Sequence, residues 1–188
     1  MARMQQQIHI READTRAHFW LVVMGVSGCG KSSLGAALAA SLGLPLIEGD
    51  DFHPEANVEK MSAGIALTDA DRAGWLDTLG KTLAEAQHGA VLTCSALKRD
   101  YRKRLRDCVP ELRFVFMSLD RDEAERRVAA RASEHMFPAS LVANQFATLE
   151  SPVGERGVLE VQATMPSSAL VTEVGDWLAA FRPTAASA

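Results

Sequence analysis

The sequence predicts an α/β fold, in which a five-stranded parallel sheet carries helices on both of its faces. Short apolar runs alternate with helical segments from Phe19 onward, an order typical of parallel strands joined by right-handed crossovers. A glycine-rich turn at residues 25–32 joins the first apolar run to the first helical segment. In such sheets ligands bind outside the carboxyl ends of the strands. We therefore expect a site at the edge where this turn lies.

The strands are identified from their hydrophobicity, because buried parallel strands form short, continuous apolar runs. The run from Phe19 to Met24 contains no charged residue and directly precedes the glycine-rich turn. Strands are expected at residues 19–24, 45–48, 91–95, 113–119 and 158–161.

Helical segments separate these strands. The longest has Thr68 or Asp69 as its N-cap, acidic residues in its first turn and Gly89 beyond its end, which are the usual signals for the start and stop of a helix. Helices are expected at residues 31–42, 56–61, 69–87, 98–108, 122–132, from about 138, and 168–181.

The length of the chain, 188 residues, suits one domain. Residues 1–17 are polar and lack periodicity, so we expect them to form an N-terminal extension. The domain is expected over residues 18–182, and residues 183–188 are expected to be a frayed tail.

Composition argues against several classes of partner. The net charge of −4 provides no overall positive field for nucleic acid or anionic lipid. The longest apolar stretch, residues 19–26, is too short to cross a bilayer. Cys29, Cys94 and Cys108 lack metal-ligand spacing, which fits reduced thiols. We therefore expect a cytoplasmic protein that binds neither nucleic acid nor a membrane.

The glycine-rich turn has the pattern of a phosphate-binding loop. Residues 25–32 match G-x-x-x-x-G-K-[ST] between a strand and a helix. Backbone N–H groups at such a helix N-terminus attract anions. Lys31 is expected to reach the β- and γ-phosphates of ATP, and the Ser32 hydroxyl to bind Mg²⁺. The predicted nucleotide-binding residues are Gly25, Val26, Ser27, Gly28, Cys29, Gly30, Lys31, Ser32 and Ser33.

Other interpretations of this turn stay open at this point. A glycine-rich connection between a strand and a helix can also lack a ligand. Cys29 is either a thiol whose oxidation blocks ATP binding or a small residue that fits the loop.

Polar residues follow the second predicted strand. Asp50 can accept a hydrogen bond from a substrate hydroxyl and take its proton as the γ-phosphoryl group moves; the alternative is a turn or capping aspartate. Glu48 or Asp50 can also contact Mg²⁺ through water. His53 is either a donor to a substrate hydroxyl or a packed loop histidine.

Two pairs of cations are spaced by one helical turn. Lys98 and Arg102 are predicted to face the cleft and bind a small carboxylate; otherwise the basic run at 98–106 is a solvated face or a nucleic-acid patch. Arg127 and Arg131 are predicted to close over the phosphates as catalytic residues of a small helical lid at about 127–145. The alternative for this second pair is favourable charge at a helix C-terminus.

Several longer motifs occur beyond the phosphate loop. Residues 49–75 follow G-D-x-x-H-P-x-x-N-x-x-K-M-x-x-G-x-P-L-x-D-x-D-R-x-x-W, except for Ala66 in place of proline. Residues 94–102 resemble C-S-A-L-K-x-x-Y-R, and residues 144–150 resemble S-Q-F-x-x-L-E, with Asn144 in place of serine. Over about residues 20–178 these motifs resemble the gluconokinase family, whose R-x-x-H-F-M-P corresponds to residues 131–138, with one extra residue and Met136 and Phe137 in swapped order.

The resemblance implies a P-loop kinase fold, similar to shikimate and nucleoside monophosphate kinases, and often a homodimer. It also implies ATP-dependent phosphorylation of D-gluconate at its terminal hydroxyl, giving 6-phospho-D-gluconate. The predicted substrate-binding residues are Asp50, His53, Lys60, Arg72, Lys98 and Arg102. Another small-molecule kinase, such as a shikimate-type enzyme, is the nearest alternative. A nucleotide switch or a nucleic-acid-binding module is disfavoured by the negative charge and by the lack of an N-K-x-D signature.

Overall fold

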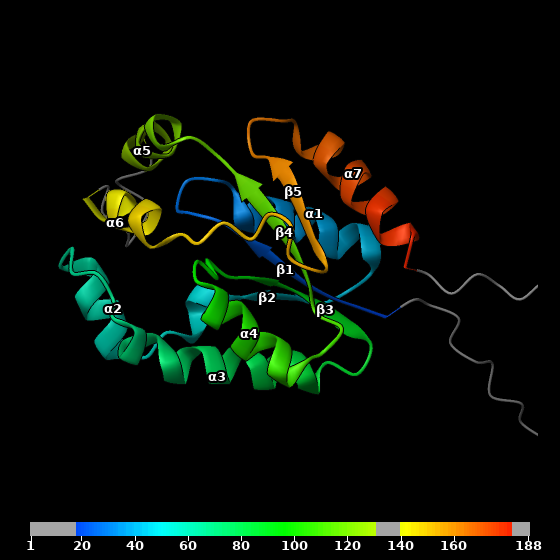
Figure 1. The fold of residues 1–188 in the computed structure, drawn as a ribbon, viewed down its shortest axis with the longest axis horizontal. Helices are drawn as coiled ribbons and strands as arrows, with labels where there is room; N and C mark the ends of the chain where they lie inside the picture. Colours follow the sequence, from blue (N-terminus) through cyan, green and yellow to red (C-terminus); the bar gives the residue numbers. More distant parts are fainter. Residues whose placement is uncertain (1–17, 131–139, 182–188) are drawn as a thin grey trace, which may run out of the picture.

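The computed structural model describes residues 18–130 and 140–181, and these form an α/β structure around one parallel sheet (Figure 1). The strand order is β2-β3-β1-β4-β5 and every pairing is parallel. The predicted fold class is therefore confirmed. The strands are β1 (Phe19–Met24), β2 (Leu46–Glu48), β3 (Gly89–Thr93), β4 (Arg113–Ser118) and β5 (Val158–Gln162).

Helices cover both faces of the sheet (Figure 1). The layer formed by α1 and α7 lies on one face and the layer formed by α3 and α4 on the other, while α2, α5 and α6 lie toward the carboxyl ends of the strands. The elements are α1 (Lys31–Leu42), the 3₁₀ turn η1 (Gly49–Phe52), α2 (Glu55–Ser62), α3 (Asp69–Glu85), α4 (Arg99–Cys108), α5 (Arg121–Ala130), α6 (Ser140–Thr148) and α7 (Ser167–Ala179).

Strand β1 lies at the centre of the sheet and faces two hydrophobic cores. Leu21 and Val23 belong to the core under α1 and α7, whereas Val22 and Met24 belong to the core under α3 and α4. All four side chains are fully buried. Because alternate residues of a strand point to opposite faces, burial on both sides requires the continuous apolar run seen in the sequence.

The start of α3 is fixed by a capping box. The Thr68 hydroxyl accepts a hydrogen bond from the Asp71 N–H, and the Asp71 carboxylate accepts one from the Thr68 N–H. Lys60 of α2 donates to the same carboxylate over 2.7 Å. The hydrogen bond from Lys60, together with those from Thr68, lowers the pKa of Asp71 to about 2. These contacts hold α2 against the first turn of α3, from which Arg72 projects.

The third strand begins and ends earlier than predicted. It starts at Gly89, which has φ +94° and pairs with Phe19 of β1; a Cβ on Gly89 would lie 2.2 Å from the Phe19 carbonyl oxygen. It ends at Thr93, so Ser95 belongs to the loop that follows, rather than to the sheet. The sequence pattern does not reveal this shift, because the glycine also resembles a helix stop signal.

Some predicted features lie outside the described residues. These are the N-terminal extension at 1–17, the middle of the lid at 131–139 with Arg131, and the tail at 183–188. Within the described ranges, no helix combines the length and apolar character needed to span a membrane.

Candidate active site

The glycine-rich turn forms a compact loop between β1 and α1. Gly25 has φ +146°, and a Cβ there would lie 2.8 Å from both the Met117 carbonyl oxygen and the Cys29 sulfur. Gly30 is the N-cap of α1 in the left-handed region, and no side chain caps the helix. The N–H groups of the first turn therefore point toward a position where an anion can accept their hydrogen bonds.

Two hydrogen bonds and one buried thiol describe this loop. The Lys31 ammonium group donates to the Val26 carbonyl over 3.1 Å. The Ser27 N–H donates to Oε1 of Gln145 on α6 over 2.6 Å. Cys29 is buried, and its burial raises the pKa of the thiol. A buried, protonated thiol favours the interpretation of Cys29 as a small residue that fits the loop.

Oxygen atoms suited to Mg²⁺ gather beside the loop. The Ser32 hydroxyl donates to Oε2 of Glu48 over 3.1 Å, and the Thr93 hydroxyl donates to the same oxygen over 2.5 Å. No group of three or more His, Cys, Asp or Glu side chains suited to a metal occurs in the described part of the chain. This donor set fits Mg²⁺, which prefers oxygen and is usually held by one or two protein groups together with phosphates and waters.

One cavity of about 490 Å³ joins the phosphate loop to the segments after β2 and β3. Its volume lies in the usual range for small-molecule sites, about 300–1,000 Å³. The predicted site residues that line it are Ser27, Gly28, Gly30, Lys31, Ser32, Ser33, Glu48, Asp50, His53, Arg72 and Arg127.

Trp75 supports the segment that carries Asp50 and His53. His53 stacks on Trp75 with the ring centroids 4.1 Å apart, and the indole N–H donates to the Gly49 carbonyl over 2.8 Å. Asp50 is exposed to the cavity from η1. Burial lowers the pKa of His53, the charge of Asp50 opposes this shift, and the charge of Arg72 adds to it. A neutral imidazole results, which can exchange hydrogen bonds with a hydroxyl group.

Of the four cations predicted to bind the substrate, the structure brings Arg72 to the cavity. Its guanidinium donates to the Leu67 carbonyl and lies 5.8 Å from the centroid of the Tyr101 ring. Lys60 instead pairs with Asp71, and Lys98 pairs with Asp69, each over 2.7 Å.

The structure corrects the prediction that Lys98 and Arg102 face the cleft together. Lys98 is the N-cap of α4 and has extended backbone angles, so the spacing rule for helical neighbours does not apply to it. Arg102 points into the protein interior, where its guanidinium donates to the Ala96 and Leu97 carbonyls and to Glu155. A buried charge needs such partners, and here they lie beneath α4 instead of in the cavity.

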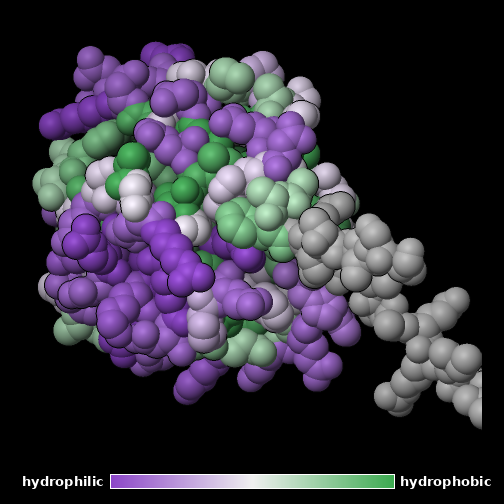
Figure 2. All heavy atoms as spheres, turned by 45° about the vertical axis from the view of Figure 1, so that its right-hand side comes forward, coloured by the Kyte–Doolittle hydropathy of each residue, from purple (hydrophilic) through white to green (hydrophobic). Residues whose placement is uncertain are grey.

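The basic run of α4 is largely neutralised by carboxylates. Lys103 pairs with Asp107 over 2.7 Å, and Arg104 pairs with Asp77 over 2.5 Å. In Figure 2 the lower half of the visible face, which contains the layer of α3 and α4 in Figure 1, is mostly hydrophilic. This charge pattern fits a solvated helix face better than a nucleic-acid patch.

Arg127 of α5 lies over the phosphate loop. Its Nε donates to Glu123 over 2.5 Å, and one terminal N–H group donates to the Ala163 carbonyl over 3.2 Å and the Gly28 carbonyl over 3.5 Å. The hydrogen bonds from Arg126 and Arg127 lower the pKa of Glu123. The carboxylate thus stays ionised and holds Arg127 at the edge of the cavity.

Several lining residues were given no role by the sequence. Ser95 lies in the loop after β3, and Asn144 and Gln145 lie on α6. For Ser95 the available signal was its place at the carboxyl end of the third strand, where ligands of such sheets bind. Asn144 and Gln145 stand within the motif at residues 144–150, and spacing along the chain does not show that α6 packs over the phosphate loop.

Comparisons with known proteins agree with this geometry. A family model described as an AAA domain matches residues 21–152. The chain is 47% identical to a gluconokinase of Gluconobacter oxydans over 158 residues, which cover 82% of this chain and 88% of that protein. It is 38% identical to the thermoresistant gluconokinase of Escherichia coli, with 82% of this chain and 90% of that protein covered.

Solved structures show the same relationship. The crystal structure of a gluconokinase from Sinorhizobium meliloti is 44% identical, has a TM-score of 0.81, and is matched over 89% of this chain and 95% of that chain. An APS kinase from Mycobacterium tuberculosis, at 20% identity and a TM-score of 0.63, covers 86% of this chain and 98% of that chain and shares the fold. From these matches and the preceding geometry, the chain belongs to the gluconokinase family.

Proposed function

We propose that this protein transfers the γ-phosphoryl group of ATP to the terminal hydroxyl of D-gluconate, giving 6-phospho-D-gluconate. The observation that carries the proposal is the cavity of about 490 Å³, which joins Lys31 and Ser32 of the phosphate loop to Asp50, His53 and Arg72. A triphosphate and a small polyhydroxylated acid can therefore lie side by side.

The phosphate loop binds the nucleotide in this proposal. Lys31 exchanges its contact with the Val26 carbonyl for the β- and γ-phosphates, and the N–H groups at the start of α1 donate to the same anion. Bound Mg²⁺ would be held by the Ser32 hydroxyl, with Glu48 nearby, and would supply neutralisation of the phosphate charge. Catalysis then depends mainly on positioning and on charge stabilisation.

The acceptor half of the cavity orients the sugar acid. Asp50 accepts the hydrogen bond of the attacking hydroxyl and takes its proton as the phosphoryl group is transferred. Neutral His53 bonds another hydroxyl, and its stacking on Trp75 fixes the ring. Arg72 binds the carboxylate, since its planar guanidinium suits that group and it is the predicted substrate cation that lines the cavity.

The role of Arg72 predicts a specific kinetic effect. Arg72→Met is expected to raise the KM for gluconate by about 10–100-fold, because a charge-assisted hydrogen bond is worth about 1.5–3 kcal/mol. The KM for ATP should change little. Lys98→Met removes a cation that pairs with Asp69 instead, and it should shift the gluconate KM by no more than about threefold. Steady-state kinetics on both variants tests this assignment. A larger rise of the gluconate KM in Lys98→Met than in Arg72→Met would contradict it.

Arg127 is proposed to stabilise the γ-phosphate during transfer, as is Arg131 of the lid. Arg127→Ala is expected to lower kcat by about 10²-fold or more, the scale of losing one preorganised donor. Arg126→Ala is the matched control, because Arg126 also pairs with Glu123 but is 71% exposed. Equal, small effects on kcat in the two variants would show that Arg127 only provides charge on the helix.

A coupled assay of ADP release tests the function itself. The wild-type protein should turn over ATP with gluconate and much less with shikimate, nucleoside monophosphates or other sugar acids. Faster turnover with one of the other acceptors would show that this acceptor, and not gluconate, is the substrate. A salt-sensitive gel shift without ATP turnover would favour a nucleic-acid-binding module.

We also propose that the enzyme requires Mg²⁺, acts in the cytoplasm and forms a homodimer. The Ser32 and Glu48 oxygens support the metal requirement, and the free thiols Cys29 and Cys94 fit a reducing compartment. Light scattering on the purified protein would measure the assembly, with a monomer mass contradicting the dimer.

A further inference from the structure

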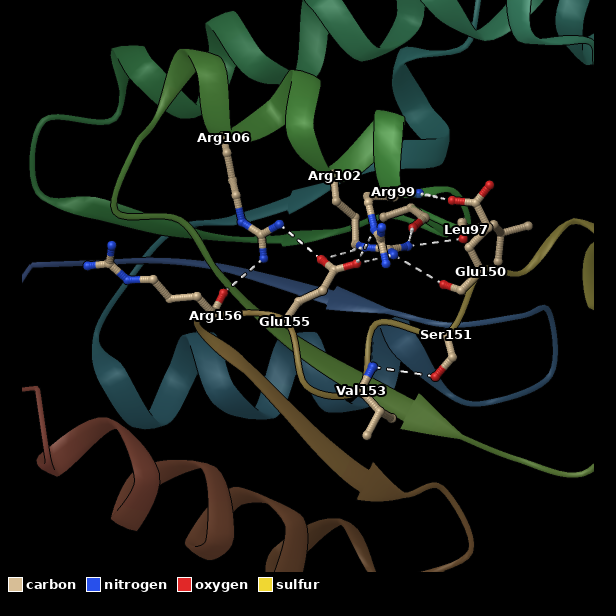
Figure 3. Close-up of polar contacts among 10 residues, drawn as sticks. Leu97, Arg99, Arg102, Arg106, Glu150, Ser151, Val153, Glu155 and Arg156 are labelled. Atoms are coloured by element: carbon tan, nitrogen blue, oxygen red, sulfur yellow. Dashed lines mark hydrogen bonds and ion pairs between the residues drawn. The ribbon is translucent and has the colours of Figure 1, made fainter.

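Arg102 is the only charged side chain that is buried within residues 18–130 and 140–181, and it has no exposed surface. Its terminal nitrogens donate to the Ala96 carbonyl over 2.9 Å, the Leu97 carbonyl over 3.0 Å and the Glu150 carbonyl over 3.1 Å. They also donate to the Glu155 carboxylate over 2.5 Å (Figure 3). One side chain thus joins the loop after β3, the segment after α6 and the turn before β5.

The carboxylate of Glu155 makes this burial possible. Burial acts to raise the pKa of Glu155, but hydrogen bonds from Arg102 and Arg106 outweigh it and lower the pKa. Arg106 donates to Oε2 over 3.0 Å, and Arg99 lies 3.6 Å from Oε1 (Figure 3). Glu155 therefore offsets the charge of Arg102. The other hydrogen bonds of Arg102 include two to the Ala96 and Leu97 carbonyls, which lie in the loop after β3.

The Ala96 and Leu97 carbonyls belong to an unusual turn beside the cavity. Ala96 has φ +45°, and it is the only residue other than glycine with positive φ in the described part of the chain. An alanine adopts this left-handed conformation only where surrounding contacts impose it. The preceding ladder ends where the Cys94 N–H donates to the Val23 carbonyl over 3.1 Å. Ser95, between that last sheet contact and Ala96, lines the cavity.

We propose that Arg102 is a positioning residue for the acceptor site: it fixes the Ala96 turn and so places the Ser95 hydroxyl where it can bond a hydroxyl of the sugar acid. This inference rests on the proposed function for the identity of the acceptor. Because Arg102 is fully buried, it cannot contact the substrate directly, and its effect on the substrate passes through Ser95. The phosphate loop is not among the partners of Arg102, so ATP binding should be nearly independent of it.

A double-mutant cycle tests the path of this effect. Ser95→Ala and Arg102→Lys should each raise the gluconate KM by about tenfold, with the ATP KM changed by less than about twofold. Lysine keeps the charge but loses the fork that bonds two carbonyls at once. The double variant should be no worse than either single variant, since both remove the same contact. Independent effects, multiplying to about 100-fold, would overturn the proposal.

A stability control separates positioning from folding. Glu155→Gln removes the charge that balances Arg102 but leaves its carbonyl contacts, so it should lower Tm without raising the gluconate KM by more than about twofold. If the gluconate KM rises in step with the loss of Tm in both Glu155→Gln and Arg102→Lys, the role of Arg102 is only structural.

Amide hydrogen exchange measures the stability of the Ala96 turn in the absence of any acceptor. Amides of residues 94–98 should exchange faster in Arg102→Lys than in the wild type or Glu155→Gln, and equal rates in all three would overturn the proposal. Failure of the wild type to phosphorylate gluconate would refute the proposed function instead. The double-mutant cycle would then be measured with the acceptor that the wild type does phosphorylate.

Discussion

Asp50→Asn is expected to lower kcat with gluconate by about 10²–10⁴-fold, the usual contribution of a positioned general base. The asparagine has nearly the same shape but cannot take the proton of the attacking hydroxyl. Asp50 lies in η1, which the Trp75 indole fixes through the Gly49 carbonyl, so the substitution should leave the backbone of the site in place. The affinity for ATP should remain within about threefold of the wild type.

Steady-state kinetics and an ATP-binding titration on the same variant check this expectation. Asp77→Asn is a suitable control, because Asp77 pairs with Arg104 on the surface of α3, outside the cavity. It should leave kcat within about twofold of the wild type. An unchanged kcat in Asp50→Asn would show that Asp50 is only a turn residue.

Lys31→Ala is expected to lower kcat/KM for ATP by about 10³-fold or more, because it removes a charged donor aimed at the transferred phosphoryl group. The fold should survive. The Lys31 ammonium group donates to the Val26 carbonyl, and the side chain is only partly buried. Loss of this group therefore removes little from the packing of β1 or α1.

Kinetics and a thermal melt together check this prediction. Lys81→Ala changes an exposed lysine of α3 and should alter neither quantity appreciably. Near-normal ATP turnover in Lys31→Ala would contradict the assignment of the phosphate loop. A loss of Tm large enough to unfold the protein would instead mean that Lys31 is structural.

The fold was largely predictable because its signals are local. The phosphate loop, its strand and its helix are contiguous, and the helix occupies the predicted residues 31–42. The capping box at Thr68 also depends on residues three positions apart. The start of β3 was not predictable in this way, since Gly89 owes its strand position to the close approach of Phe19, which is distant in sequence.

The candidate site was predictable only in part, for a related reason. Asp50 and His53 follow β2, and the rule that ligands bind at the carboxyl ends of parallel strands predicts their place in the cavity, although β3 lies between β2 and β1. The direction of Arg102 depends on which face of α4 packs inward and on Glu155, more than fifty residues away. The contact between Gln145 and the Ser27 N–H likewise spans 118 positions and leaves no local pattern.

Isothermal titration calorimetry tests most directly whether the phosphate loop and the acceptor site form one bisubstrate cavity. The folded wild-type protein should bind a non-hydrolysable ATP analogue with Mg²⁺ and should also bind gluconate. Lys31→Ala should lose most of its affinity for the analogue and keep its affinity for gluconate, while Arg72→Met should show the reverse. A folded wild-type sample that binds neither the analogue nor gluconate, alone or together, would contradict this assignment.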